Sequence, residues 1–93
     1  MNTGIIHFAQ QTSNMLYNIG CREDGKKIDD AKDAFNNAIK ALKELQWDSL
    51  CAIRGEKRYE LIIHQRNVIK CYTKLKRSLL EVYRDIFLSI KDF

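Results

Sequence analysis

Proline is absent from all 93 residues of this chain, and no other feature constrains the fold as strongly. Proline removes a backbone donor and clashes inside a helix, so a chain without it leaves long helices uninterrupted. Apolar residues recur at steps of three and four along three segments, which is the period of amphipathic helices. We therefore expect an all-α fold, either a three-helix bundle or an extended helical hairpin, with a short N-terminal helix and a long C-terminal helix.

The periodicity predicts a single helical domain over residues 1–93. Its first helix is expected at about residues 3–19, with Thr3 as the N-cap. Gly20 follows where a left-handed C-terminal cap is expected. The polar residues after it are punctuated by a second glycine, Gly25, and this pattern predicts a loop.

The second helix is accordingly placed at residues 28–46, where apolar positions alternate between steps of three and four. Gly55 is the predicted break after it, because glycine costs about 1 kcal/mol in a helix interior. The third helix is expected over residues 56–91, where a wide apolar face predicts contacts with two neighbours.

The third helix is long for so small a protein. A helix over residues 56–91 would span about 54 Å, whereas a compact domain of this size is roughly 30 Å across. We expect either a break near residues 73–78 or an end that projects from the bundle. A projecting end would expose a large apolar patch, which is typical of an interface. The predicted partner-binding residues are Tyr83, Ile86, Phe87, Ile90 and Phe93.

The net positive charge of the chain comes from its C-terminal segment. The chain has a net charge of +4, of which residues 54–93 contribute +5, residues 22–53 contribute −1 and residues 1–21 contribute nothing. The predicted polyanion-binding or acidic-partner residues are Arg66, Lys70, Lys74, Arg77 and Arg84. We refer to these five as the basic ladder, which Glu81 interrupts. Such a ladder is typical of a solvated helix face, an acidic partner or a phosphate backbone.

No catalytic or metal-binding pattern is visible. Cys51, His64 and Cys71 lack the close ligand pairs that structural zinc sites use. The glycines form no phosphate-binding loop, and no serine or cysteine sits in a strand–turn–helix elbow. We therefore predict no enzyme activity, no cofactor and no metal.

Three widely spaced cysteines favour reduced thiols in an intracellular protein over a disulfide framework. The N-terminal residues lack the basic region of a signal peptide, and no apolar run is long enough to span a bilayer. A cytoplasmic location is therefore expected.

These observations predict a small helical protein that acts by binding. An inhibitor, an antitoxin or immunity-type protein, a chaperone and a complex subunit all match this description. The expected partner is another protein, a second copy of the chain, or both, and we expect a homodimer. The alternative is nucleic-acid binding through the basic face of the C-terminal helix.

Overall fold

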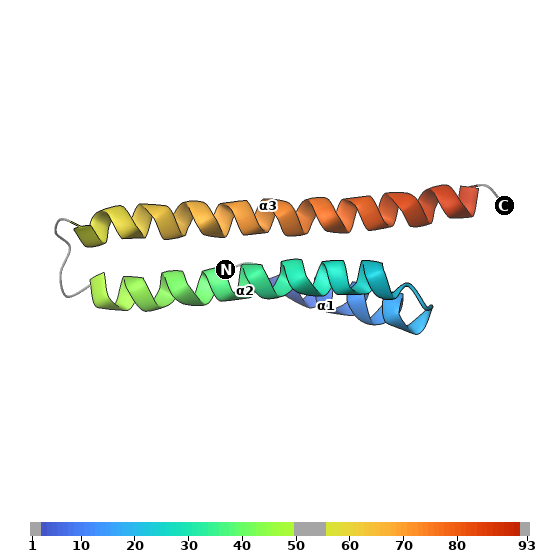
Figure 1. Ribbon diagram of the computed structural model, residues 1–93, viewed down its shortest axis with the longest axis horizontal. Helices are drawn as coiled ribbons and strands as arrows, with labels where there is room; N and C mark the ends of the chain where they lie inside the picture. Colours follow the sequence, from blue (N-terminus) through green and yellow to red (C-terminus); the bar gives the residue numbers. More distant parts are fainter. Residues whose placement is uncertain (1–2, 50–55, 92–93) are drawn as a thin grey trace.

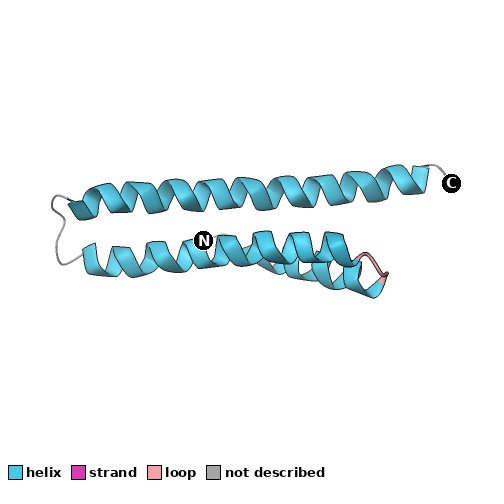
Figure 2. Cartoon of the chain, viewed as in Figure 1, coloured by secondary structure: helices cyan, strands magenta, loops and turns pink. Residues whose placement is uncertain are grey.

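The computed structural model describes residues 3–49 and 56–91, and nearly all of them are helical (Figure 1). Helix α1 runs over Thr3–Asn18, α2 over Arg22–Ser49 and α3 over Glu56–Lys91. The described residues contain no strand (Figure 2). The all-α prediction is thus confirmed. The arrangement is an extended hairpin of α2 and α3, with the short α1 packed against α2.

The molecule is a rod. Its principal extents are 60 × 19 × 19 Å and its radius of gyration is 16.8 Å. The expectation of a compact domain about 30 Å across is therefore wrong, and α3 runs without a break through residues 73–78. The reason is the length of α2: its 28 residues extend over about 42 Å and support far more of α3 than the predicted helix would.

A tight turn joins α1 to α2 (Figure 2). Gly20 adopts a φ of 87°, in the left-handed region that glycine enters without a steric penalty. The Cys21 N–H donates to the Leu16 carbonyl at 2.8 Å, and the Gly20 N–H donates to the Tyr17 carbonyl at 3.2 Å. These two bonds form a Schellman cap, so the predicted role of Gly20 is confirmed.

Replacing Gly20 by alanine is expected to lower the free energy of unfolding by about 1–2 kcal/mol, because a Cβ is strained at this φ. Gly4→Ala is the control: Gly4 lies within α1, is exposed, and a Cβ there meets nothing within 4 Å. That change should leave stability equal or raise it by up to about 1 kcal/mol, because alanine favours helix. Urea denaturation measures both, and equal losses at the two glycines would contradict the assignment.

Helix α2 begins at Arg22, six residues before the predicted start, so the prediction of a loop between Gly20 and residue 28 is mostly wrong. Glu23 and Asp24 lie in the first turn, where negative charge stabilises the positive end of the helix dipole. Gly25 is buried inside the helix, and a Cβ there would lie 3.2 Å from the ring of Tyr17. This glycine therefore marks a close approach of α1 to α2 instead of a turn.

The core is concentrated toward one end of the rod. Its buried cluster draws on all three helices: Ala9, Leu16, Ile28, Ala31, Phe35, Leu75, Leu79 and Val82. The small residues Ala9 and Ala31 let neighbouring backbones approach closely. By contrast, none of the side chains described for residues 58–74 is fully buried. The half of the hairpin beyond α1 is thus a two-helix section with only half-buried contacts.

Candidate interaction surface on the third helix

Among the described side chains of α3, eight large apolar ones are exposed, and four of them lie along one side of the helix. Ile62, Ile69, Leu80 and Phe87 are 41%, 64%, 62% and 64% exposed. Their successive separations are seven, eleven and seven residues. At 3.6 residues per turn, each of these steps returns close to the same side of a helix. We call these four residues the apolar edge of α3.

Buried residues occupy a different side of the same helix. Leu75 and Val82 are 0% and 4% exposed and belong to the core cluster. They lie six and thirteen residues after Ile69, which places both of them well round the helix from the apolar edge. The apolar edge is therefore additional to the core-facing side of α3, and Ile69, Leu80 and Phe87 keep more than half of their surface exposed.

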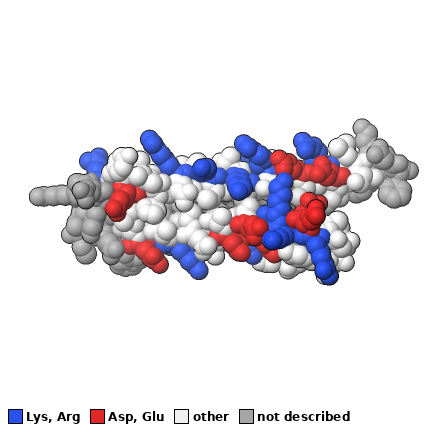
Figure 3. Space-filling model, viewed as in Figure 1, with Lys and Arg blue, Asp and Glu red and all other residues white. Residues whose placement is uncertain are grey.

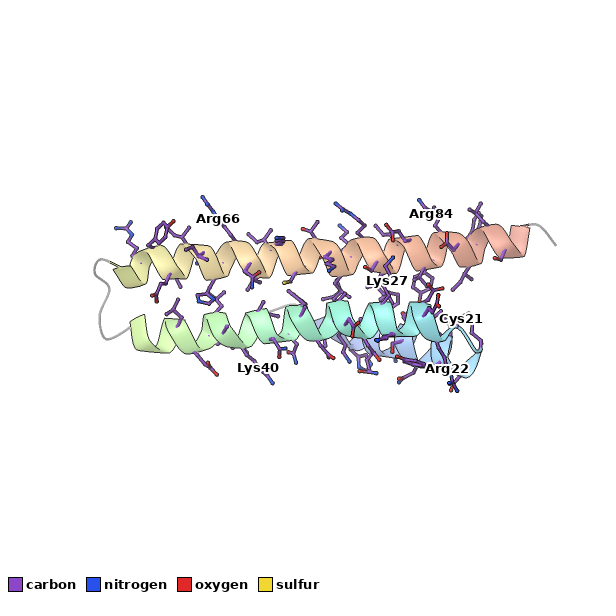
Figure 4. All side chains as sticks on the ribbon, in the orientation of Figure 1. Cys21, Arg22, Lys27, Lys40, Arg66 and Arg84 are labelled. Atoms are coloured by element: carbon purple, nitrogen blue, oxygen red, sulfur yellow. The ribbon has the colours of Figure 1, made fainter. Side chains whose placement is uncertain are left out.

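The charged neighbours of the apolar edge are all basic. Helix residues three or four apart are surface neighbours. Counting these positions from each member of the edge, the charged side chains described are Arg58, Arg66, Lys76, Arg77 and Arg84. Figure 3 shows Lys and Arg spaced along the side of the molecule that α3 forms. Arg66 and Arg84 point away from α2 (Figure 4).

These basic side chains have little acidic compensation within the molecule. Arg84 has an ion-pair contact, from its Nε to an Asp85 carboxylate oxygen, at a long 3.9 Å with both side chains mostly exposed. The other four flanking residues have no ion-pair partner among the described residues. An exposed ion pair of this kind stabilises a protein by at most about 1 kcal/mol. The basic side chains beside the apolar edge, which we call its basic flanks, therefore remain available to an external anion.

Two of the predicted partner-binding residues have contacts inside the fold. The Thr12 hydroxyl donates to the Phe8 carbonyl at 2.9 Å, so the 2.9 Å contact between Thr12 and Tyr83 requires the Tyr83 O–H as donor. The Tyr83 ring also stacks on Phe8, with centroids 5.6 Å apart. Ile86 is half-buried and packs against the core. Tyr83 and Ile86 therefore help to hold the fold together.

Phe87 is the predicted apolar residue that is most exposed, and it borders a shallow groove. The groove is lined by Leu80, Tyr83, Arg84, Ile86 and Phe87. The Ile90 side chain and Phe93 lie outside the described part of the structure. Leu80 was absent from the predicted site, although its separation of eighteen residues from Ile62, five helical turns, was a usable signal.

The basic ladder lies along the exposed surface of α3, and each of its five members is exposed. Glu81, the acid that interrupts the ladder, is engaged with another helix. The Lys27 ammonium of α2 donates to the Glu81 carboxylate at 2.9 Å (Figure 4 labels Lys27). This pair joins α2 to α3 across the surface.

Lys27 lowers the pKa of Glu81 below its usual 4.5, chiefly through this hydrogen bond and then through its charge. The same bond raises the pKa of Lys27 above 10.5. The Glu81 contribution to stability is therefore present above its unfolded-state pKa and is lost as pH falls through the lower folded value. The Lys27 contribution is present below 10.5 and is lost as pH rises through the higher folded value.

Replacing Lys27 by glutamine is expected to raise the pKa of Glu81 toward 4.5, because the hydrogen bond to a cation and its charge are both removed. NMR titration of the glutamate side-chain carbonyl carbons measures this shift. Lys40→Gln is a matched control on the same helix, since Lys40 is exposed and points away from α3 (Figure 4). A Glu81 pKa unchanged by Lys27→Gln would contradict the pairing.

Polar side-chain contacts also join α1 to α2. The buried Ser13 hydroxyl donates to the Asp29 carboxylate at 2.6 Å, and Lys32 donates to the Gln10 side-chain oxygen. Partial desolvation and the nearby Asp29 carboxylate raise the pKa of Tyr17. These contacts between side chains of α1 and α2 help to fix the position of α1.

The remaining candidate groups are dispersed. Cys21 is exposed and Cys71 is half-buried, with its thiol 3.9 Å from the Asn67 side-chain oxygen. Cys51 lies outside the described residues. Within residues 3–49 and 56–91, no three His, Cys, Asp or Glu side chains come together in a metal-binding group. The described helices also include none with an apolar stretch long enough to cross a bilayer.

Comparison of the chain with protein-family models, with curated proteins and with solved structures finds no match.

Proposed function

We propose that this protein is a helical interaction module that acts by presenting the outer surface of α3 to a protein partner. The observation that carries the proposal is the apolar edge, in which four large apolar residues are 41–64% exposed along one line of the helix. Scattered single apolar residues are ordinary on protein surfaces, but an extended exposed array is typical of an interface.

Leu80 and Phe87 of the apolar edge contribute little to the fold that presents them. The core cluster lies elsewhere on α3, at Leu75, Leu79 and Val82. Leu80 and Phe87 each lose less than half of their surface to the protein, so neither supplies much burial. Exposed apolar residues that do not stabilise the monomer are the ones whose burial on binding contributes most to association.

The test compares two double variants in the native cell. The edge variant, Leu80→Asp with Phe87→Asp, places charge on the apolar edge. The control variant, Ala34→Asp with Asn37→Asp, places the same charge at exposed positions of α2. Chemical cross-linking in cells and sedimentation of the purified chain measure association. We expect the wild type and the control variant to associate and the edge variant to lose at least tenfold in affinity.

A monomeric wild type whose cross-linked products are unchanged in the edge variant would overturn this proposal. Circular dichroism and urea denaturation of each variant separate lost binding from lost folding. The edge variant is expected to keep its helix content, because the substituted side chains are more than half exposed.

Nucleic-acid binding is the second candidate, and the exposed basic ladder is the observation that favours it. Binding to phosphates falls linearly with the logarithm of salt concentration, with a slope near −0.9 for each phosphate neutralised on duplex DNA. Titration of unrelated duplex DNA and RNA at two salt concentrations tests this function. Micromolar binding at moderate salt that is lost in Arg66→Glu with Arg77→Glu, but kept in the edge variant, would favour it.

A further inference from the structure

We infer that the occupant of the apolar edge is an acidic amphipathic helix of another protein, lying along α3 with its acidic residues against the basic flanks. This inference rests on the proposed function and specifies its partner. Three features of the edge support it: its shape, the charges beside it and its poor match to a second copy of the chain.

The shape of the edge suits a helix. Ile62 and Phe87 are 25 residues apart, so the edge is about 38 Å long. It is narrow at its middle, where Thr73 and Lys76 lie between Ile69 and Leu80, and the exposed rings of Tyr59 and Tyr83 border it toward its two ends. A partner helix of about 26 residues covers this length and buries one apolar stripe of its own against it. A bilayer surface or a globular face would contact a wider apolar area than the edge provides.

The charges beside the apolar edge favour an acidic partner. Every described charged side chain three or four residues from the edge is basic, on both of its sides. Among the acids of α3 nearest to the edge, Glu81 bonds to Lys27 of α2, Asp85 makes only the long contact to Arg84, and Glu60 and Asp85 each lie two residues from an edge residue, on a different side of the helix. Complementary flanking charges select partners and suppress wrong ones, because like charges across a helix interface repel. Glutamate and aspartate beside a partner's apolar stripe would meet this pattern along its whole length.

A second copy of the chain suits the edge less well. Two antiparallel copies would align its apolar positions, with Ile62 opposite Phe87 and Ile69 opposite Leu80, because these pairs are symmetric about one midpoint. The flanks of each copy, however, are basic, so Arg and Lys would face Arg and Lys on both sides of the seam. In such a dimer the apolar contact is favourable but the flanking charges repel each other. With an acidic partner helix, both the apolar contact and the charge interaction are favourable.

The probes are two labelled synthetic peptides of about 28 residues. Both carry leucine at the first and fourth heptad positions, and their flanking positions are glutamate in the acidic peptide and lysine in the basic one. Fluorescence anisotropy against the full chain measures affinity. At moderate salt we expect the acidic peptide to bind at least tenfold more tightly than the basic one, and this ratio should shrink as salt rises.

Two variants of the chain make the test specific. The edge variant, Leu80→Asp with Phe87→Asp, should lose binding of the acidic peptide. The charge-reversed variant, Arg66→Glu with Arg77→Glu and Arg84→Glu, should invert the preference and bind the basic peptide more tightly. All three reversed positions are exposed, so the fold should be retained, and circular dichroism checks this. A preference that charge reversal leaves unchanged would overturn the inference.

Other outcomes separate this inference from the proposed function. Edge-dependent dimerisation in sedimentation, without binding of either peptide, would make a second copy the occupant; the inference fails and the proposed function stands. Edge-dependent binding to vesicles of mixed neutral and anionic phospholipid, stronger than to the acidic peptide, would overturn both. Failure of both peptides, together with unchanged cross-linking in the edge variant, would also overturn both.

Discussion

Replacing Leu75 by alanine is expected to lower the free energy of unfolding by about 2–5 kcal/mol. Leu75 is 0% exposed and lies in the core cluster, where α3 meets the other helices. The truncation removes buried methyl groups and leaves a cavity that the surrounding helices fill only in part. For a domain of this size the loss is a large share of the total stability. Urea denaturation followed by circular dichroism measures the change.

Leu80→Ala is the matched control for this result. It is the same substitution on the same helix, five residues further on, at a side chain that is 62% exposed. We expect a change within about 0.5 kcal/mol. If the two substitutions cost the same, the division of α3 into a core-facing side and an apolar edge is wrong.

Enlarging Ala31 to leucine is expected to lower the free energy of unfolding by about 1–3 kcal/mol, because a well-packed core must move to admit the extra volume. Ala31 is 5% exposed and belongs to the core cluster. Ala34→Leu on the same helix is the control, since Ala34 is exposed and its change should be within about 0.5 kcal/mol. An unchanged stability in Ala31→Leu would contradict the close helix packing inferred at this position.

Helix positions were predicted best where one local rule acted alone. The bounds of α3 match the prediction, because its apolar period runs without a glycine or proline to interrupt it. The cap at Gly20 was predicted for a similar reason, since glycine after an apolar helical period favours the left-handed conformation. The start of α2 was missed because Gly25 resembles a turn signal. Its actual role depends on the ring of Tyr17, which no local pattern reveals.

The candidate surface was predicted in part. The basic ladder and Phe87 are exposed, as a helix period with charged and apolar sides indicates. The period alone does not say which apolar residues of α3 face α2, which face α1 and which remain free. That division depends on α1 having only 16 residues and meeting α3 through Phe8 and Thr12. Leu80, Ile62 and Ile69 were therefore left out of the predicted site, and the structural role of Tyr83 was missed.

Concentration of the core toward one end also gives the rod a gradient of local unfolding free energy. Residues 75–82 of α3 include fully buried side chains, whereas residues 58–74 have none, so amide hydrogen exchange should be slow in the first stretch and faster in the second. The apolar edge crosses this boundary, with Leu80 and Phe87 beyond it and Ile62 and Ile69 before it. A bound partner would contact Leu80 and Phe87 near the core. It would also contact Ile62 and Ile69, and so slow local unfolding of the part of α3 that has no fully buried side chain. Binding of the proposed partner along α3 would therefore be coupled to the local stability of the half of the hairpin that lies beyond α1.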